Sequence, residues 1–135
     1  MEEFCAAENL QIRKGDAVLA RTGYGRFWMT DPPRYLRAAG VSKEADLWLA
    51  DKQVQLIGSD NTSWDHSVPL PPKRERTHFA HEYMLAQKGI YIVENMNLEP
   101  LSADRCYEFL FLCLPLRFQG ATASWVRPLA LRQQA

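Results

Sequence analysis

The sequence predicts an α/β domain, because short segments with strand character alternate along the chain with segments that can form helices. Three segments of strand character are separated from one another by helical or loop-forming sequence, at residues 17–21, 53–58 and 90–93. Two further strands are expected near the end of the chain, at residues 107–118 and 125–131. The first of these two is the longest apolar stretch, which favours a strand in the core.

Helices are expected at the start of the chain and between the strands. Residues 1–12 carry apolar side chains at roughly helical spacing. Ser42 can cap a helix over residues 43–51, because its hydroxyl can accept a hydrogen bond from a backbone N–H of the first turn. Thr77 can cap a third helix over residues 78–88 in the same way.

Glycine and proline mark the loops between these elements. Residues 22–26 hold two glycines close together, which permits positive φ angles and breaks regular structure. Residues 31–33 read Asp-Pro-Pro and are expected to form another break. Residues 59–76 are polar and contain several prolines, so they are expected to form a long loop, of a length that is often functional or disordered.

Composition limits the classes of function. The chain has 135 residues, about one domain, and residues 1–135 are interpreted as a single one. Its 16 Lys and Arg balance its 16 Asp and Glu, so it lacks the basic excess of a nucleic-acid-binding protein. The run Lys73–Arg76 is short and interrupted by an acid, which favours a solvated loop over a binding patch.

Location is inferred from hydropathy and cysteine usage. No window is apolar enough over about 18 residues to cross a membrane, and the first residues lack the pattern of a signal peptide. Cys5, Cys106 and Cys113 are an odd number without a close pair, as expected for reduced thiols. The last two lie in an apolar run and are interpreted as buried packing residues. We therefore expect a cytoplasmic protein.

All three histidines fall between positions 66 and 81, and they are the main chemical signal. His78 and His81 are three residues apart, so they share one face of the expected helix. Glu94 ends the next expected strand and could meet His81, giving an imidazole nitrogen and a carboxylate oxygen to a Zn²⁺ or Mn²⁺ ion. A surface histidine beside a salt bridge at the strand end explains the same spacing.

Two other groups of residues have a binding and a structural interpretation. Residues 58–63, Gly-Ser-Asp-Asn-Thr-Ser, directly follow a strand and could surround a ligand, or could simply form Asx turns. Four aromatic residues near loops could line a pocket or pack internally: Tyr24, Phe27, Trp28 and Trp64. The sequence has no nucleophile elbow, no phosphate-binding glycine loop and no HExxH motif.

Several stretches together resemble the later half of the cyclase family, which includes bacterial kynurenine formamidases and related amide hydrolases. They are KGDAVLARTGY at 14–24, LWLADK at 47–52, LIGSD at 56–60, HEYML at 81–85, GIYIVENM at 89–96, LPLR at 114–117 and GATAS at 120–124. Their order and spacing cover nearly the whole chain.

The resemblance implies an α/β fold built around a curved mixed β-sheet flanked by helices, and an oligomer. It also implies a divalent metal, Zn²⁺ or Mn²⁺, that activates water to attack an amide or similar carbonyl. By position, His81 matches the family's late histidine ligand and Glu94 matches its glutamate ligand. The family's early signature, His-x-Gly-Thr-His-x-Asp-x-Pro, is expected upstream of residue 1, and the sequence has no histidine before His66.

Three hypotheses follow for function. The first is a partial, arylformamidase-like amide hydrolase whose catalysis is impaired or depends on a partner for the missing metal-ligand segment, with a small aromatic amide as ligand. The second is a non-catalytic small-molecule-binding or self-association module that reuses the fold. The third is an enzyme whose acid-base residues are His66, His78 or His81 with Asp60 or Asp65. No nucleic acid or membrane is expected as a partner.

Overall fold

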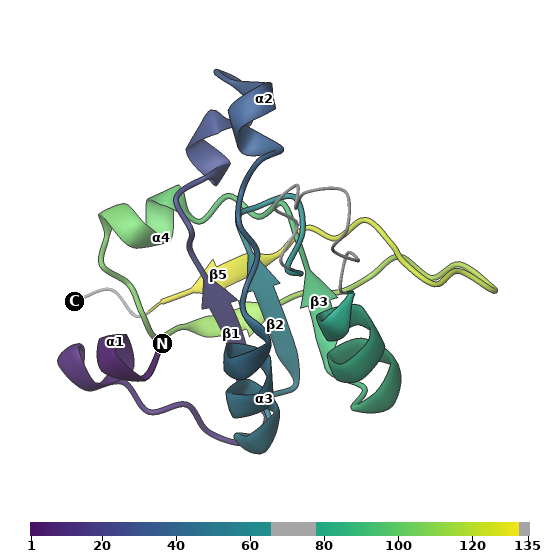
Figure 1. The fold of residues 1–135 in the computed structure, drawn as a ribbon, viewed down its shortest axis with the longest axis horizontal. Helices are drawn as coiled ribbons and strands as arrows, with labels where there is room; N and C mark the ends of the chain where they lie inside the picture. Colours follow the sequence, from purple (N-terminus) through teal and green to yellow (C-terminus); the bar gives the residue numbers. More distant parts are fainter. Residues whose placement is uncertain (66–77, 133–135) are drawn as a thin grey trace, which may run out of the picture. The chain divides into compact units, whose positions relative to one another are not determined.

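The computed structural model describes residues 1–65 and 78–132, shown in Figure 1. His66, the run Lys73–Arg76 and the expected cap Thr77 lie outside the described residues. Contacts divide the chain into two compact units, Met1–Pro100 and Leu101–Ala135.

The first unit is built on a three-stranded parallel sheet. Its strands are β1 (Ala17–Ala20), β2 (Leu56–Ser59) and β3 (Tyr91–Val93), in the order β1-β2-β3. Val18 is paired with Ile57, and Ile57 in turn with Ile92. The sequence-based prediction of strands at these three places is confirmed, although each strand is shorter than expected and β2 ends one residue later. Parallel neighbours require crossover connections, and helical segments make them here.

Helix α3 (Lys43–Asp51) begins where the sequence indicated. The Ser42 hydroxyl accepts a hydrogen bond from the Ala45 N–H at 3.4 Å, as expected for an N-cap. Helix α1 (Glu2–Ala7) is shorter than the expected 1–12. The caps and apolar periodicity therefore located both helices, although only α3 has the predicted length.

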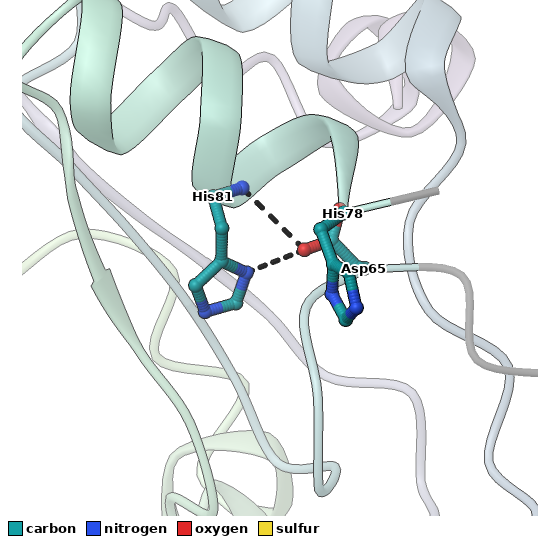
Figure 2. A group of neighbouring side chains, drawn as sticks. All are labelled: Asp65, His78 and His81. Atoms are coloured by element: carbon teal, nitrogen blue, oxygen red, sulfur yellow. Dashed lines mark hydrogen bonds and ion pairs between the residues drawn. The ribbon is translucent and has the colours of Figure 1, made fainter. Parts of the chain in front are cut away.

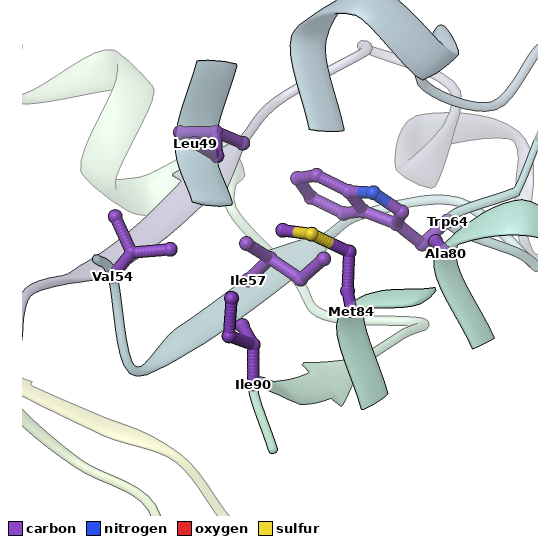
Figure 3. Packing of buried hydrophobic residues seen from close by; sticks show 7 residues of the cluster. All are labelled: Leu49, Val54, Ile57, Trp64, Ala80, Met84 and Ile90. Carbon is purple, nitrogen blue, oxygen red and sulfur yellow. The ribbon is translucent and has the colours of Figure 1, made fainter. Parts of the chain in front are cut away.

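The core of this unit lies between the sheet and two helices. Figure 3 shows side chains from α3, from β2, from the residue just before β3 and from the helical segment η2 (Ala80–Gln87) gathered in one cluster. The cluster consists of Leu49, Val54, Ile57, Trp64, Ala80, Met84 and Ile90. Burying a large apolar side chain contributes roughly 1.5–3 kcal/mol relative to leaving it exposed, so this cluster is the main source of stability for the unit.

Two short helical turns lie in residues 22–35, where the sequence predicted a loop followed by an interruption of regular structure. Residues 25–27 form the 3-10 turn η1 (Gly25–Phe27), and residues after Asp31 form α2 (Pro32–Tyr35). The prediction of a break at 31–33 was wrong because Asp31 acts as a cap, its carboxylate accepting the Arg34 N–H at 3.1 Å. Proline at the first helical position has no N–H that the helix would need.

The helix expected at 78–88 is a π-helix, η2 (Ala80–Gln87). Its backbone includes a hydrogen bond from Lys88 N–H to Tyr83 O at 3.0 Å, one residue wider than in an α-helix. Ala80 and Met84 are its buried residues and pack into the core. Sequence periodicity predicted a helix correctly but could not distinguish the two types, because the apolar positions suit both.

The second unit contains an antiparallel pair rather than a continuation of the first sheet. Strands β4 (Leu110–Leu112) and β5 (Leu129–Leu131) pair with Phe111 opposite Ala130. The expected single mixed sheet is therefore two sheets, one parallel and one antiparallel. Helix α4 (Glu99–Ala103), which the sequence patterns did not indicate, spans the boundary between the units.

The prediction of a core strand over 107–118 was wrong. Only three of its residues form β4, and its leucines are exposed, with Leu114 at 80% and Leu110 at 61%. An apolar run predicts burial only where a second layer covers it, and a two-stranded ribbon has little to bury against. Cys106 and Cys113 are likewise half-buried instead of fully buried, and all three cysteines are free thiols. Among the described residues, no helix is long and apolar enough to cross a membrane.

Asp60 organises the loop that follows β1. Its buried carboxylate accepts hydrogen bonds from the Thr22 N–H at 2.7 Å, the Thr22 hydroxyl at 2.7 Å, the Gly23 N–H at 2.9 Å and the Gly25 N–H at 3.3 Å. Gly23 has φ +80°, which a side chain would disfavour. A Cβ on Gly25 would lie 3.1 Å from the Asp60 Cβ, so glycine also permits the close approach. Residues 58–63 were open to a ligand-binding or a structural interpretation, and for the carboxylate of Asp60 the structural one holds.

Trp64 and Asp46 form a buried polar contact inside the core. The Trp64 indole N–H donates to the Asp46 carboxylate at 2.7 Å, and both residues are at most 1% exposed. Burial raises the pKa of Asp46 to about 6, although the indole hydrogen bond opposes the shift, and the nearby charge of Asp65 adds to it. The ionised form of Asp46 is therefore disfavoured in the folded protein.

We predict that replacing Asp60 destabilises the first unit. Asp60→Asn keeps the size of the side chain but replaces one acceptor oxygen by an NH₂ group, so it can accept fewer backbone N–H groups. A hydrogen bond to a carboxylate contributes at most roughly 3 kcal/mol to stability. A loss of about 2 kcal/mol in the free energy of unfolding is expected in urea titrations. The exposed Asp51→Asn is the control and should change stability by less than about 0.5 kcal/mol. Equal effects of the two substitutions would contradict the anchoring role.

We also predict that Asp46 makes stability fall as pH rises. Its pKa is raised in the folded state from 3.8 to about 6, so between these values the folded protein binds the proton more tightly than the unfolded chain. Its favourable contribution is complete below about pH 4 and is lost as the pH rises through about 6, with a total change on the order of 3 kcal/mol. Asp46→Asn removes this term while keeping an acceptor for the indole. Parallel stability curves for the two proteins across pH 4–7 would refute it.

Candidate metal centre

The polar residues of the candidate site follow the carboxyl ends of the parallel strands. Thr22 follows β1, Asp60 follows β2, and Glu94 directly follows β3. In open α/β sheets these ends meet at one edge, which is where ligands commonly bind. The strand pairing thus explains why residues far apart in the sequence meet on one side of this sheet.

The segment that contains Trp64 and Asp65 is held in place from several sides. The Trp64 side chain is fully buried in the core, and its carbonyl accepts the Val41 N–H at 2.7 Å. Its own N–H donates to Glu94 Oε1 at 2.8 Å. Asp65 forms an isolated parallel bridge with Val41. The backbone here is therefore fixed by hydrophobic burial and hydrogen bonds together.

Asp65 lies at the first turn of η2, as Figure 2 shows. Its Oδ1 accepts the Ala80 N–H at 2.7 Å, and its Oδ2 accepts the His81 N–H at 3.4 Å. The first backbone N–H groups of a helix lack partners within the helix, and the helix dipole favours a negative charge there. This explains how a carboxylate that is only 4% exposed can remain in this place.

The His81 ring lies between two carboxylates. Its Nδ1 makes a short hydrogen bond with Asp65 Oδ2 (Figure 2). Its Nε2 lies 4.0 Å from Glu94 Oε1. The side chains of His81 and Glu94 are 41% and 25% exposed, so a solute can reach both. The structure thus places near each other the two residues that the sequence singled out as metal ligands.

His78 lies next to this pair at the start of the helical segment. One ligand atom from each of Asp65, His78 and His81 falls within 4.8 Å of the others, which makes them a second possible donor set. The rings of the two histidines are edge-on with centroids 6.3 Å apart, as expected for residues three apart on a helix. His78 itself is exposed.

A buried tyrosine supports the turn that carries Glu94. The Tyr35 hydroxyl makes a short hydrogen bond with Asn95 Oδ1, and the Asn95 N–H donates to Asn61 O at 2.9 Å. Asn95 has φ +59°, a conformation that asparagine tolerates better than most residues. Burial, with the charges of Asp60 and Glu94, raises the pKa of Tyr35 to about 12, so the phenol remains a donor. Apart from the asparagine itself, no sequence pattern indicated this contact.

The aromatic residues considered as pocket walls do not share one site. Trp64 is fully buried in the core, whereas Trp28 is 55% exposed and contacts Tyr35 edge-on. Phe27 packs edge-on against Tyr24, and the Arg34 guanidinium lies 3.9 Å from its ring centroid. These contacts favour the packing interpretation over a pocket.

The donor set of His81 and Glu94 is compatible with a divalent metal. Imidazole nitrogen and carboxylate oxygen are both ordinary zinc ligands at about 2.0–2.2 Å, and two such ligands at a tetrahedral angle lie about 3.4 Å apart. The observed separation of 4.0 Å is close to this value. Catalytic zinc normally has three protein ligands, so this pair would form only part of a complete site.

The comparisons with known proteins point to one family. Residues 1–66 match the family model described as "Putative cyclase". A solved structure described as the crystal structure of a novel cyclase superposes with a TM-score of 0.81 at 25% sequence identity, covering 97% of this chain. The comparison with curated proteins gives no match.

The extent of these matches is uneven along the chain. The family model covers β1, α3, β2 and Asp65 but ends before His81 and Glu94. The chain spans 45% of the solved cyclase that it resembles. Residues 1–66 therefore carry a cyclase-family match, and the chain as a whole has a cyclase-like fold that covers about half of that larger protein.

Proposed function

We propose that this chain carries part of the metal site of a cyclase-type amide hydrolase, with His81 Nε2 and a Glu94 carboxylate oxygen as ligands for Zn²⁺ or Mn²⁺. The observation that carries the proposal is that His81 Nε2 and Glu94 Oε1 lie 4.0 Å apart, while the other ring nitrogen, Nδ1, is hydrogen-bonded to Asp65. The match of residues 1–66 and the cyclase-like fold support the reaction class.

Within this proposal, each side chain has a defined task. His81 presents an imidazole nitrogen at an accessible edge of η2, and Glu94 presents a carboxylate that the Trp64 N–H holds at 2.8 Å. The Tyr35–Asn95 contact keeps the turn after β3 in place. A bound Zn²⁺ or Mn²⁺ supplies Lewis acidity toward a carbonyl group and activates water for hydrolysis.

Two ligands alone give a weak site, so the proposal requires further donors from outside this pair. A partner that carries the family's early histidine-rich segment is the proposed source, and a small aromatic amide is the proposed substrate class. On this view the chain alone has impaired hydrolysis, and activity depends on that partner. Rapid metal-dependent hydrolysis of an N-formyl aromatic amide by the purified chain alone would contradict the dependence.

Metal binding provides the direct test. After dialysis against Zn²⁺ or Mn²⁺, native mass spectrometry of the chain should show one bound ion, and His81→Ala or Glu94→Ala should each remove it. Isothermal titration should show at least a tenfold loss of affinity, because a two-ligand site cannot lose one ligand and keep the ion.

His78→Ala is the matched control for this experiment. It removes a histidine three residues away that the proposal does not use, and binding should remain within about twofold of the unaltered chain. Loss of the ion in His78→Ala with retention in Glu94→Ala would assign the metal to Asp65, His78 and His81 instead. Absence of binding in the unaltered chain would refute a metal site formed by this chain alone.

The second candidate is self-association through the second unit. That unit exposes a group of large apolar side chains: Leu110, Leu112, Leu114, Leu116, Phe118, Trp125, Leu129 and Leu131. Exposed apolar residues gathered on one small element are typical of interaction surfaces. A second copy of the chain is the proposed partner, since a symmetric pair would cover the same surface on both molecules.

Sedimentation velocity tests this candidate. The chain should sediment as a dimer or larger species, and the double variant Leu114→Ser with Trp125→Ser should shift it toward monomer by at least tenfold in the dissociation constant. Met29→Ser is the control, because Met29 is 83% exposed in the first unit and is not part of the proposed surface. A monomer at all concentrations, or equal weakening by both variants, would exclude this interface.

A further inference from the structure

Asp65 makes too many contacts within the protein to be a simple metal ligand. Its two oxygens accept two backbone N–H groups of η2, Oδ2 also makes a short hydrogen bond with His81 Nδ1, and its side chain is only 4% exposed. A ligand carboxylate needs an accessible lone pair directed at the ion. Glu94, with a side chain that is 25% exposed, meets that requirement better.

We propose that Asp65 is a positioning residue that fixes the tautomer and orientation of the His81 ring, so that Nδ1 carries the proton and Nε2 presents its lone pair toward Glu94. This inference rests on the proposed metal site. A neutral imidazole has one donor nitrogen and one acceptor nitrogen, and the partner of one decides the role of the other. Both Asp65 oxygens already act as acceptors, Oδ1 for the Ala80 N–H and Oδ2 for the His81 N–H, so the ring nitrogen that faces Oδ2 is assigned as the donor.

The same carboxylate also fixes where the ring lies. Because Oδ1 and Oδ2 are held by the N–H groups of Ala80 and His81, the acceptor cannot move without opening the first turn of η2. The His81 side chain is thus tied to the backbone of its own helix through one rigid group, as Figure 2 shows. This arrangement makes the spacing between Nε2 and Glu94 a property of the folded chain before any metal binds.

Asp65→Asn tests the inference because it changes one oxygen into a donor. Either orientation of the amide sets its NH₂ group against one backbone N–H, that of Ala80 at the Oδ1 position or that of His81 at the Oδ2 position. The Ala80 contact is the closer one, 2.7 Å against 3.4 Å, so the amide oxygen is expected to face Ala80. The NH₂ group then faces His81 Nδ1, which must become the acceptor and leave the proton on Nε2. The substitution therefore shifts the ring to the tautomer that blocks the proposed ligand atom.

The readout is the tautomer of His81 in the metal-free chain, measured by long-range ¹H–¹⁵N correlation spectra. The spectra are recorded after dialysis against a chelator, at a pH where the ring shifts no longer change. The unaltered chain should show the proton on Nδ1, and Asp65→Asn should move it to Nε2. The His78 ring serves as an internal control that should not change, with His78→Gln used for assignment.

Zinc affinity is the second readout. Loss of a group that orients a metal-bound histidine typically lowers affinity about 10- to 100-fold, and the same loss is expected for Asp65→Asn. A proton on Nε2 in the unaltered chain, or an unchanged tautomer in a folded Asp65→Asn variant, would overturn the inference. The spectra of the unaltered chain decide the first point even if the variant fails to fold. Failure of the chain to bind zinc with the expected tautomer present would instead refute the metal site formed by this chain alone and leave the orienting role of Asp65 intact.

Discussion

The fixed position of Trp64 and Asp65 is the constraint on which the rest of the first unit depends. The indole of Trp64 fills the core between α3, β2 and η2, and its main chain bonds to Val41 and Glu94. Burial of this ring supplies the free energy that holds the chain there, since a large aromatic side chain contributes more apolar area than any neighbour. Asp65 follows directly and meets η2 as that helix begins. The same short segment therefore contributes a core side chain, Trp64, and a side chain of the candidate site, Asp65.

Three buried carboxylates in this unit are stabilised by different sets of hydrogen-bond donors. Asp60 is surrounded by donors from a single loop, and Asp65 by a helix start and a histidine. Asp46 has one indole donor, and its pKa rises to about 6 as a result of burial. With a single donor opposing the cost of burial, Asp46 favours its neutral form. Asp60 organises the loop after β1, whereas Asp65 holds the first turn of η2.

Local sequence signals located the elements of the first unit better than those of the second. Ser42 and the alternating strand residues predicted α3 and β2 because caps and periodicity act within a few residues. The apolar run around Leu114 led to a wrong prediction of a buried strand. Burial depends on which other part of the protein packs over the strand, and a local sequence pattern does not contain that information. His81 and Glu94 could be paired in advance from their places on neighbouring elements. The role of Asp65 could not, since it depends on the contact of Asp65 with the first turn of η2, which no local sequence pattern indicates.

The wider backbone rings of η2 limit how its length can change during evolution. Met84 must reach the core while His81 must reach Asp65, and both demands are met on one helix whose hydrogen bonds span an extra residue. Deleting a single residue between these two positions would allow ordinary α-helical bonding, yet it would turn one of the side chains away from its partner. Relatives that keep both contacts should therefore align without gaps across this helix, whereas gaps should be tolerated in loops such as the one that joins β4 to β5.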